Sequence, residues 1–205
     1  MKKSFTLLEL ILVIVVLSVC YYSFFVKIEN DKIKDAASRI KLYLKQVRYQ
    51  ALIDSKRDQT NSLWHKKRWT LKFFRCNKSV DGIYYVIYHD ENMKGHPNMD
   101  ESMNDPLTNK KIYSSNKCET TSQTSKYVLL TKEFGIEDVV ISCNSTSSLG
   151  QISFGDDGKI YSKLSNYEDK EDEYEITGTC EIELKSNESQ NIVLKIEGGS
   201  GYVYE

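Results

Sequence analysis

Glu9 has the most unusual chemical setting in the sequence. It is the only charged residue among the twenty residues from Leu7 to Val26, which are otherwise mainly aliphatic or aromatic. A carboxylate in a lipid-facing helix costs a few kcal/mol, so its presence indicates a function and a partner of opposite charge. Pairing the two charges removes most of the cost of burying either one.

The cysteines form a second group of reactive side chains. Cys20 lies inside the hydrophobic segment, and four more are spread over the polar remainder without the close pairing typical of zinc sites: Cys76, Cys118, Cys143 and Cys180. Such scattered cysteines behind a hydrophobic anchor predict two disulfides in an oxidising compartment. No spacing rule fixes the connectivity, and four unpaired thiols are the alternative. If the cysteines pair, Cys76–Cys118 and Cys143–Cys180 is the simplest arrangement.

The segment between Lys56 and Lys78 has the composition of a nucleic-acid contact. Its cations are Lys56, Arg57, Lys66, Lys67, Arg68, Lys72, Arg75 and Lys78, and its interleaved rings are Trp64, Trp69, Phe73 and Phe74. Cations neutralise phosphates and rings stack on bases, so the pattern suggests single-strand contact through Lys66, Lys67, Arg68 and Lys72. The alternative is that the rings face the core while the lysines meet the acidic stretch 168–175.

A polar loop carries oxygen ligands in the register of a calcium loop. Counting from Asp90, Asn92 is third, Asn98 ninth and Glu101 twelfth, with Gly95 at the turn. A cation, Lys94, occupies the fifth ligand position, and no helical pattern flanks the loop. A solvated polar loop is therefore the preferred interpretation, and we expect no metal site.

Catalytic chemistry has little support in the sequence. The three histidines, His65, His89 and His96, lie in polar or loop-like contexts and read as surface residues. No nucleophile motif or glycine-rich phosphate loop is present. We therefore expect neither enzymatic activity nor a cofactor, and the formal net charge of −1 gives no global field for nucleic acid.

The elements that position these residues begin with a long helix. No proline or glycine occurs from Phe5 to about Ser55. Residues 5–26 have the length and apolarity of a transmembrane helix, with the lysines of residues 1–4 on the cytoplasmic side. Residues 27–55 are amphipathic, with one apolar stripe formed by Ile33, Ala37, Ile40, Leu44, Val47 and Ala51. The alternative is a short anchor followed by a separate helix.

Beyond the helix, residues 56–205 favour a β-rich globular domain. Alternating apolar residues predict strands near 69–74, 83–88, 139–141, 150–154, 159–161, 181–184 and 192–196. Asp81–Gly82 and Asp157–Gly158 are turn dipeptides between strand candidates, and residues 90–126 form a long polar loop. The predicted fold class is α+β, with the long N-terminal helix packed on a mainly antiparallel sheet.

The N-terminus resembles the cleavage and methylation motif of type IV pilins and pseudopilins. The shared features are the short basic leader, Phe5, Glu9 at the fifth position from Phe5, and the unbroken apolar run. The resemblance implies a pilin-like fold, cleavage between Ser4 and Phe5 by a prepilin peptidase, and N-methylation of Phe5. It also implies that Glu9 pairs with the terminal amine of a neighbouring subunit. Ser4 departs from the glycine that the family usually has before the cut.

The soluble part resembles H-type minor pseudopilins and their FimT-like relatives. The resemblance lies in residues 51–74 and in the block from Ile152 to Ile160, followed by a strand pair and a glycine-led terminus. FimT-like relatives bind DNA through an arginine-bearing C-terminal tail, whereas residues 198–205 contain no cation.

This resemblance implies a minor pseudopilin of a type II secretion or competence system. The chain would cross the bacterial inner membrane once and hold its C-terminal domain in the periplasm. Its partners would be other pseudopilins or pilins, the prepilin peptidase and the inner-membrane assembly platform. The alternative is a DNA-binding minor pilin for natural transformation.

Overall fold

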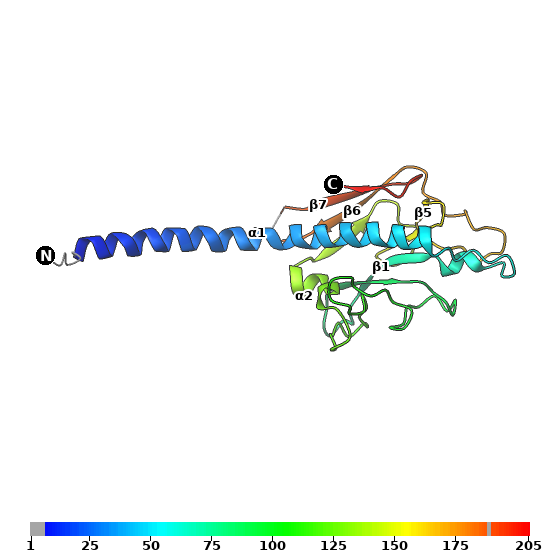
Figure 1. Ribbon diagram of the computed structural model, residues 1–205, viewed down its shortest axis with the longest axis horizontal. Helices are drawn as coiled ribbons and strands as arrows, with labels where there is room; N and C mark the ends of the chain where they lie inside the picture. Colours follow the sequence, from blue (N-terminus) through cyan, green and yellow to red (C-terminus); the bar gives the residue numbers. More distant parts are fainter. Residues whose placement is uncertain (1–6, 188–189) are drawn as a thin grey trace.

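The protein has an α+β fold in which one long helix lies against two antiparallel sheets (Figure 1). The computed structural model describes residues 7–187 and 190–205, and it leaves the side chains of residues 23–31 undescribed. The predicted leader 1–4 and the cleavage and methylation site at Ser4 and Phe5 lie outside the described residues. After the helix α1 (Leu7–Ile53), the elements are η1 (Trp64–Lys67), β1 (Trp69–Arg75), β2 (Ile83–Tyr88), η2 (Lys126–Val128), α2 (Leu130–Phe134), β3 (Asp138–Ile141), β4 (Gln151–Phe154), β5 (Ile160–Tyr161), β6 (Thr179–Lys185), β7 (Ile192–Glu197) and β8 (Val203–Tyr204).

Helix α1 is continuous over 47 residues, so the prediction of one long helix is confirmed over Leu7–Ile53. At a rise of 1.5 Å per residue its length is about 70 Å. Its C-terminal half lies along the β domain, and its N-terminal half extends beyond that domain (Figure 1). Within the described part of the chain, no helix combines the length and apolarity required of a membrane span. Phe5 and Thr6 of the predicted span 5–26 fall outside that part.

The strands form two four-stranded sheets, and every pairing is antiparallel. The first sheet has the order β2-β1-β4-β5, and the second has the order β3-β6-β7-β8. Helix α1 contacts β1 and β4 of the first sheet and β7 and β8 of the second. The strand positions and the antiparallel pairing were predictable from the alternating pattern, but the division into two sheets was not.

The predicted apolar stripe of α1 is buried against these sheets. Ile40, Leu44 and Val47 are fully buried, and Ile33, Ala37 and Ala51 are at most 3 % exposed. The first sheet also contacts the helix at Tyr43, whose ring lies 6.0 Å from that of Tyr85 in β2. Each large apolar side chain buried in this way contributes roughly 1.5–3 kcal/mol.

Two disulfides cross-link the β domain. Cys76, at the end of β1, is bonded to Cys118 in the long loop, and Cys143, after β3, is bonded to Cys180 in β6. This is the pairing that the sequence analysis names as the simplest. Cys20 is the one unpaired cysteine among the described residues, and it is exposed on α1.

The long loop of residues 90–126 has more internal structure than the sequence suggests. Isolated bridges join Tyr88 to Ser102, Asn104 to Lys111 and Lys111 to Thr124. Met103 and Ile112 are buried and add their side chains to the core. The short helix α2 that follows was also not predicted, and its left-handed cap at Gly135 (φ 69°) ends it after five residues.

Candidate functional site

The N-terminal half of α1 carries a continuous run of exposed apolar side chains. Every described side chain from Leu7 to Tyr22 is exposed, and the exposed fraction is 76 % for Leu7 and 57 % for Ile14. Glu9 lies in the first turn of the helix, where a carboxylate interacts favourably with the helix dipole. Large exposed apolar surfaces mark sites of association with other proteins or with membranes.

A second apolar stripe occurs on the C-terminal half of the same helix. Leu42, Tyr49 and Ile53 are 48 %, 61 % and 60 % exposed. At 100° per residue they lie on the side of α1 opposite the buried stripe that contains Leu44 and Val47. This outward stripe therefore faces away from both sheets.

The predicted nucleic-acid contact is wrong for Arg68. Its side chain is 5 % exposed and donates a hydrogen bond of 2.6 Å to the carbonyl oxygen of Glu171. The guanidinium lies 3.7 Å from the ring centroid of Tyr161 and 3.7 Å from a carboxylate oxygen of Asp172. Burial lowers the pKa of Arg68, and the nearby acidic and phenolic groups oppose that shift. Arg68, which directly precedes β1, thus joins that strand to the acidic stretch 168–175.

The other three residues of the predicted nucleic-acid contact do not form one surface. Lys67 forms an ion pair of 2.7 Å with Glu91, whereas Lys66 and Lys72 line a groove on the outer face of the first sheet. The predicted stacking rings are mostly internal: Trp69 is 7 % exposed, and Phe73 is fully buried. A surface of cations interleaved with exposed rings is therefore not formed by this segment.

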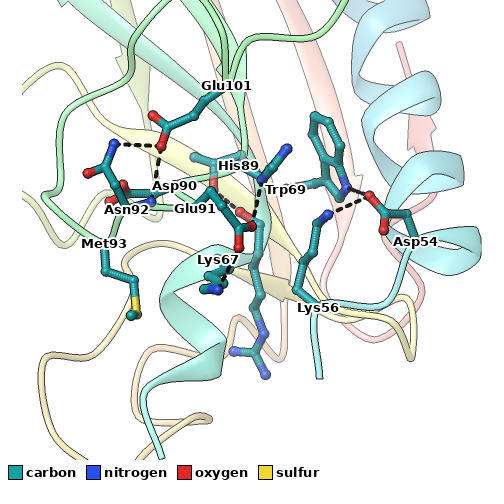
Figure 2. Close-up of polar contacts among 12 residues, drawn as sticks. Asp54, Lys56, Lys67, Trp69, His89, Asp90, Glu91, Asn92, Met93 and Glu101 are labelled. Atoms are coloured by element: carbon teal, nitrogen blue, oxygen red, sulfur yellow. Dashed lines mark hydrogen bonds and ion pairs between the residues drawn. The ribbon is translucent and has the colours of Figure 1, made fainter. Parts of the chain in front are cut away.

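A charged network ties the end of α1 to the first sheet (Figure 2). The indole N–H of Trp69 donates to Asp54 at 3.0 Å, and Lys56 forms an ion pair of 2.7 Å with the same carboxylate. The ring of His89 lies 4.6 Å from that of Trp69, and its Nδ1 is 3.5 Å from Glu91. Burial, together with the charge of Lys56, lowers the pKa of His89.

The expectation that all three histidines are surface residues is wrong for His65 and His89. His65 is completely buried, and its Nε2 lies 3.0 Å from the carbonyl oxygen of Ser165. His89 is partly buried, and only His96 is exposed as predicted. Burial lowers the pKa of His65, which favours the neutral ring. These histidines act as parts of the folded domain and do not converge on one site.

The calcium-loop candidates are engaged by hydrogen-bond donors of their own loop. Asp90 accepts hydrogen bonds from the backbone N–H groups of Lys94 and Gly95, at 3.1 and 2.6 Å. Glu101 accepts a hydrogen bond of 2.6 Å from the side-chain amide of Asn92 (Figure 2). It also accepts a hydrogen bond of 2.5 Å from the side-chain amide of Asn98. Across residues 7–187 and 190–205, no group of three or more His, Cys, Asp and Glu side chains is arranged to hold a metal ion. The carboxylates close the loop through its own amides.

The sequence analysis did not predict the groove that Lys66 and Lys72 line. It has a volume of about 540 Å³, and the other segments that line it include residues 93–95, 145–148 and 163–166. Lys94 and Lys163 join the two predicted lysines there. Lys94 and Lys163 are distant in the sequence from Lys66 and Lys72 and from each other, so no local spacing pattern could have grouped them with those two lysines. We call this feature the basic groove.

Comparison with protein-family models, with curated proteins and with solved structures finds no match to this chain.

Proposed function

We propose that the protein is a pilin-like structural subunit, specifically a minor pseudopilin of a type II secretion or competence system. Its N-terminal helix anchors the chain in the bacterial inner membrane and then packs among the helices of neighbouring subunits. The β domain lies in the periplasm. Its partners are other pseudopilins or pilins, the prepilin peptidase and the assembly platform.

The observation that carries the proposal is the uncovered apolar half of α1. The side chains of Leu10 and Val16 are 52 % exposed, although they belong to the same continuous helix as the buried Leu44. Exposure of so much apolar area to water is unfavourable by about 25 cal/mol per Å², so lipid or other helices are needed to cover it. The rest of the domain buries a full core without this segment.

Glu9 supports assembly rather than simple anchoring. A passive anchor gains nothing from a carboxylate within its apolar run, because lipid offers no compensating charge. The N-terminal amine of a neighbouring subunit, released by cleavage before Phe5, supplies that charge. The outward stripe of Leu42, Tyr49 and Ile53 gives a second apolar surface on which a neighbouring helix can pack.

The two disulfides agree with the proposed compartment. Disulfides persist in oxidising compartments such as the periplasm and are rare in the cytosol. Both bonds lie in the β domain, and the exposed Cys20 lies on the helix. This distribution supports a chain whose domain and N-terminal segment occupy different environments.

The proposal is tested by the intact mass and the N-terminal sequence of the protein isolated from its own host. We expect a chain that begins at methylated Phe5. A host strain without its prepilin peptidase is the control and should yield a chain that begins at Met1. A chain that begins at Met1 in the normal host, or at a lipidated Cys20, would contradict the proposal.

A further inference from the structure

The basic groove lies on the outer face of the first sheet. In the strand register, Lys72 of β1 pairs with Val86 of β2 on one side and with Gln151 of β4 on the other. Paired residues share a face, and side chains alternate between faces along a strand. Leu71 and Phe73 therefore face the core, and Lys72 and Gln151 form the floor of the groove.

The groove contains an excess of positive charge. Four lysines line it, Lys66, Lys72, Lys94 and Lys163, against the single carboxylate of Asp90. That carboxylate already accepts two backbone hydrogen bonds from the adjacent turn. Among the described residues, none of the four ammonium groups has an ion pair within 4.0 Å, whereas Lys56, Lys67 and Lys159 outside the groove each pair with a carboxylate.

Lys72 is partly buried in the floor of the groove. Its ammonium lies 5.2 Å from the ring centroid of Phe74, and burial lowers its pKa while Asp90 partly opposes that shift. A partly buried ammonium without a close counter-ion is unfavourable. An anion that occupied the groove would remove this cost.

The lining restricts the chemistry of that anion. Residues 145–148 present hydroxyl groups, and Gln151 and Asn166 add amides, so the wall is polar. The cations of the lining are all lysines, which bind phosphate as flexible point charges. Tyr88 is the only aromatic residue that lines the groove, and at 5 % exposure it offers no ring face for a nucleobase.

We propose that the basic groove binds a compact anion that carries several phosphate groups. Its volume of about 540 Å³ falls within the usual range for small-molecule sites. The four lysines contact the phosphate oxygens from several sides, and the hydroxyl-bearing loop 145–148 closes the opposite wall. This site does not depend on the assembly role of α1.

The test is isothermal titration of the full-length protein in detergent micelles with sodium tripolyphosphate. We expect saturable binding that weakens as NaCl is raised, because the contacts are ionic. The variants Lys72→Gln and Lys163→Gln should each weaken binding about tenfold, as expected for losing one charge-assisted contact. Lys132→Gln, on α2 away from the groove, is the matched control and should bind like the wild type.

Three outcomes would overturn the proposal. The first is the absence of saturable heat in the wild type, and the second is an equal effect of Lys132→Gln and the two groove variants. The third comes from a parallel titration with a single-stranded oligonucleotide: binding that depends on the same lysines and is far tighter than that of tripolyphosphate would assign the groove to nucleic acid. Circular dichroism of each variant verifies that the domain remains folded.

Discussion

Both halves of α1 carry large apolar side chains, but the two halves differ in what covers those side chains. In the C-terminal half, Ile40 and Leu44 are fully buried by the two sheets. In the N-terminal half, Leu12 and Val16 are 59 % and 52 % exposed. The same helix thus carries an intramolecular core at one end and an uncovered apolar surface at the other. The difference indicates that the N-terminal half packs against a molecule other than its own chain.

A matched pair of truncations gives the sharpest contrast between the halves. We expect Leu44→Ala to lower the free energy of unfolding by about 3–5 kcal/mol, because it leaves a cavity in a packed core. Leu12→Ala should change it by less than about 0.5 kcal/mol. Urea unfolding of both variants in the same detergent measures the difference. Equal destabilisation would show that the N-terminal half also packs within its own chain.

Removal of a disulfide tests the stability of the β domain, which buries the C-terminal half of α1. Cys143 and Cys180 are separated by 37 residues, and they link the segment after β3 to the second sheet. Replacing both with serine should destabilise the β domain by about 2–4 kcal/mol, since the unfolded chain gains freedom. Thermal unfolding would report this loss, while processing before Phe5 should be unaffected. A variant as stable as the wild type would contradict the proposed contribution.

We expect the free energy of unfolding to depend on pH through Asp54, the carboxylate that follows the C-terminal end of α1. Asp54 is partly buried, which opposes ionisation, but its hydrogen bonds from Lys56 and Trp69 lower its pKa below the usual 3.8. The ionised form therefore adds stability that is complete above this value and is lost as the pH falls through the lower, folded-state pKa. Because Asp54 is 37 % exposed, solvent screening makes this effect smaller than that of the disulfide.

The variant Asp54→Asn measures this contribution. The stability gap between wild type and variant should be present at pH 7 and should narrow as the pH approaches 3. Asp169→Asn, in the exposed acidic loop, is the control for loss of a carboxylate and should leave the stability at pH 7 unchanged. A gap that is constant with pH would exclude the ionised carboxylate as its cause.

The smallest expected change in stability comes from the outward stripe. Tyr49→Lys should alter the free energy of unfolding by less than about 0.5 kcal/mol, because the ring is 61 % exposed. It should nevertheless reduce co-isolation with pilin-like partners from the host, since a charge replaces an apolar contact. Leu107→Lys changes an apolar residue of the β domain that is 74 % exposed, and it should leave co-isolation intact. Equal recovery of partners with both variants would remove the stripe from the interface.

Periodic features of the fold were predictable from the sequence. The stripe from Ile33 to Ala51 follows the helical period, and β6, in which buried residues alternate with more exposed ones, follows the period of two. These patterns record which side of an element is buried. They do not record which sheet a strand joins, so the division into two sheets appeared only in the structure.

The site residues were less predictable because their partners are distant in the sequence. Arg68 has the local context of a surface cation, yet its partners Tyr161 and Glu171 lie about a hundred residues later. The buried His65 meets Ser165 in the same way. Lys94 and Lys163 carry no local signal for the basic groove, which exists only because three loops converge over β1.

The central claim is that other helices cover the N-terminal half of α1, and photo-cross-linking in the host tests it most directly. A photoreactive amino acid is placed at Val16, with the same residue at Leu107 as the control. The account predicts adducts at Val16 that contain the N-terminal helix of a second pilin-like subunit, and it predicts their loss in a Glu9→Ala background. Adducts with lipid alone, or adducts that persist unchanged without the Glu9 carboxylate, would contradict it.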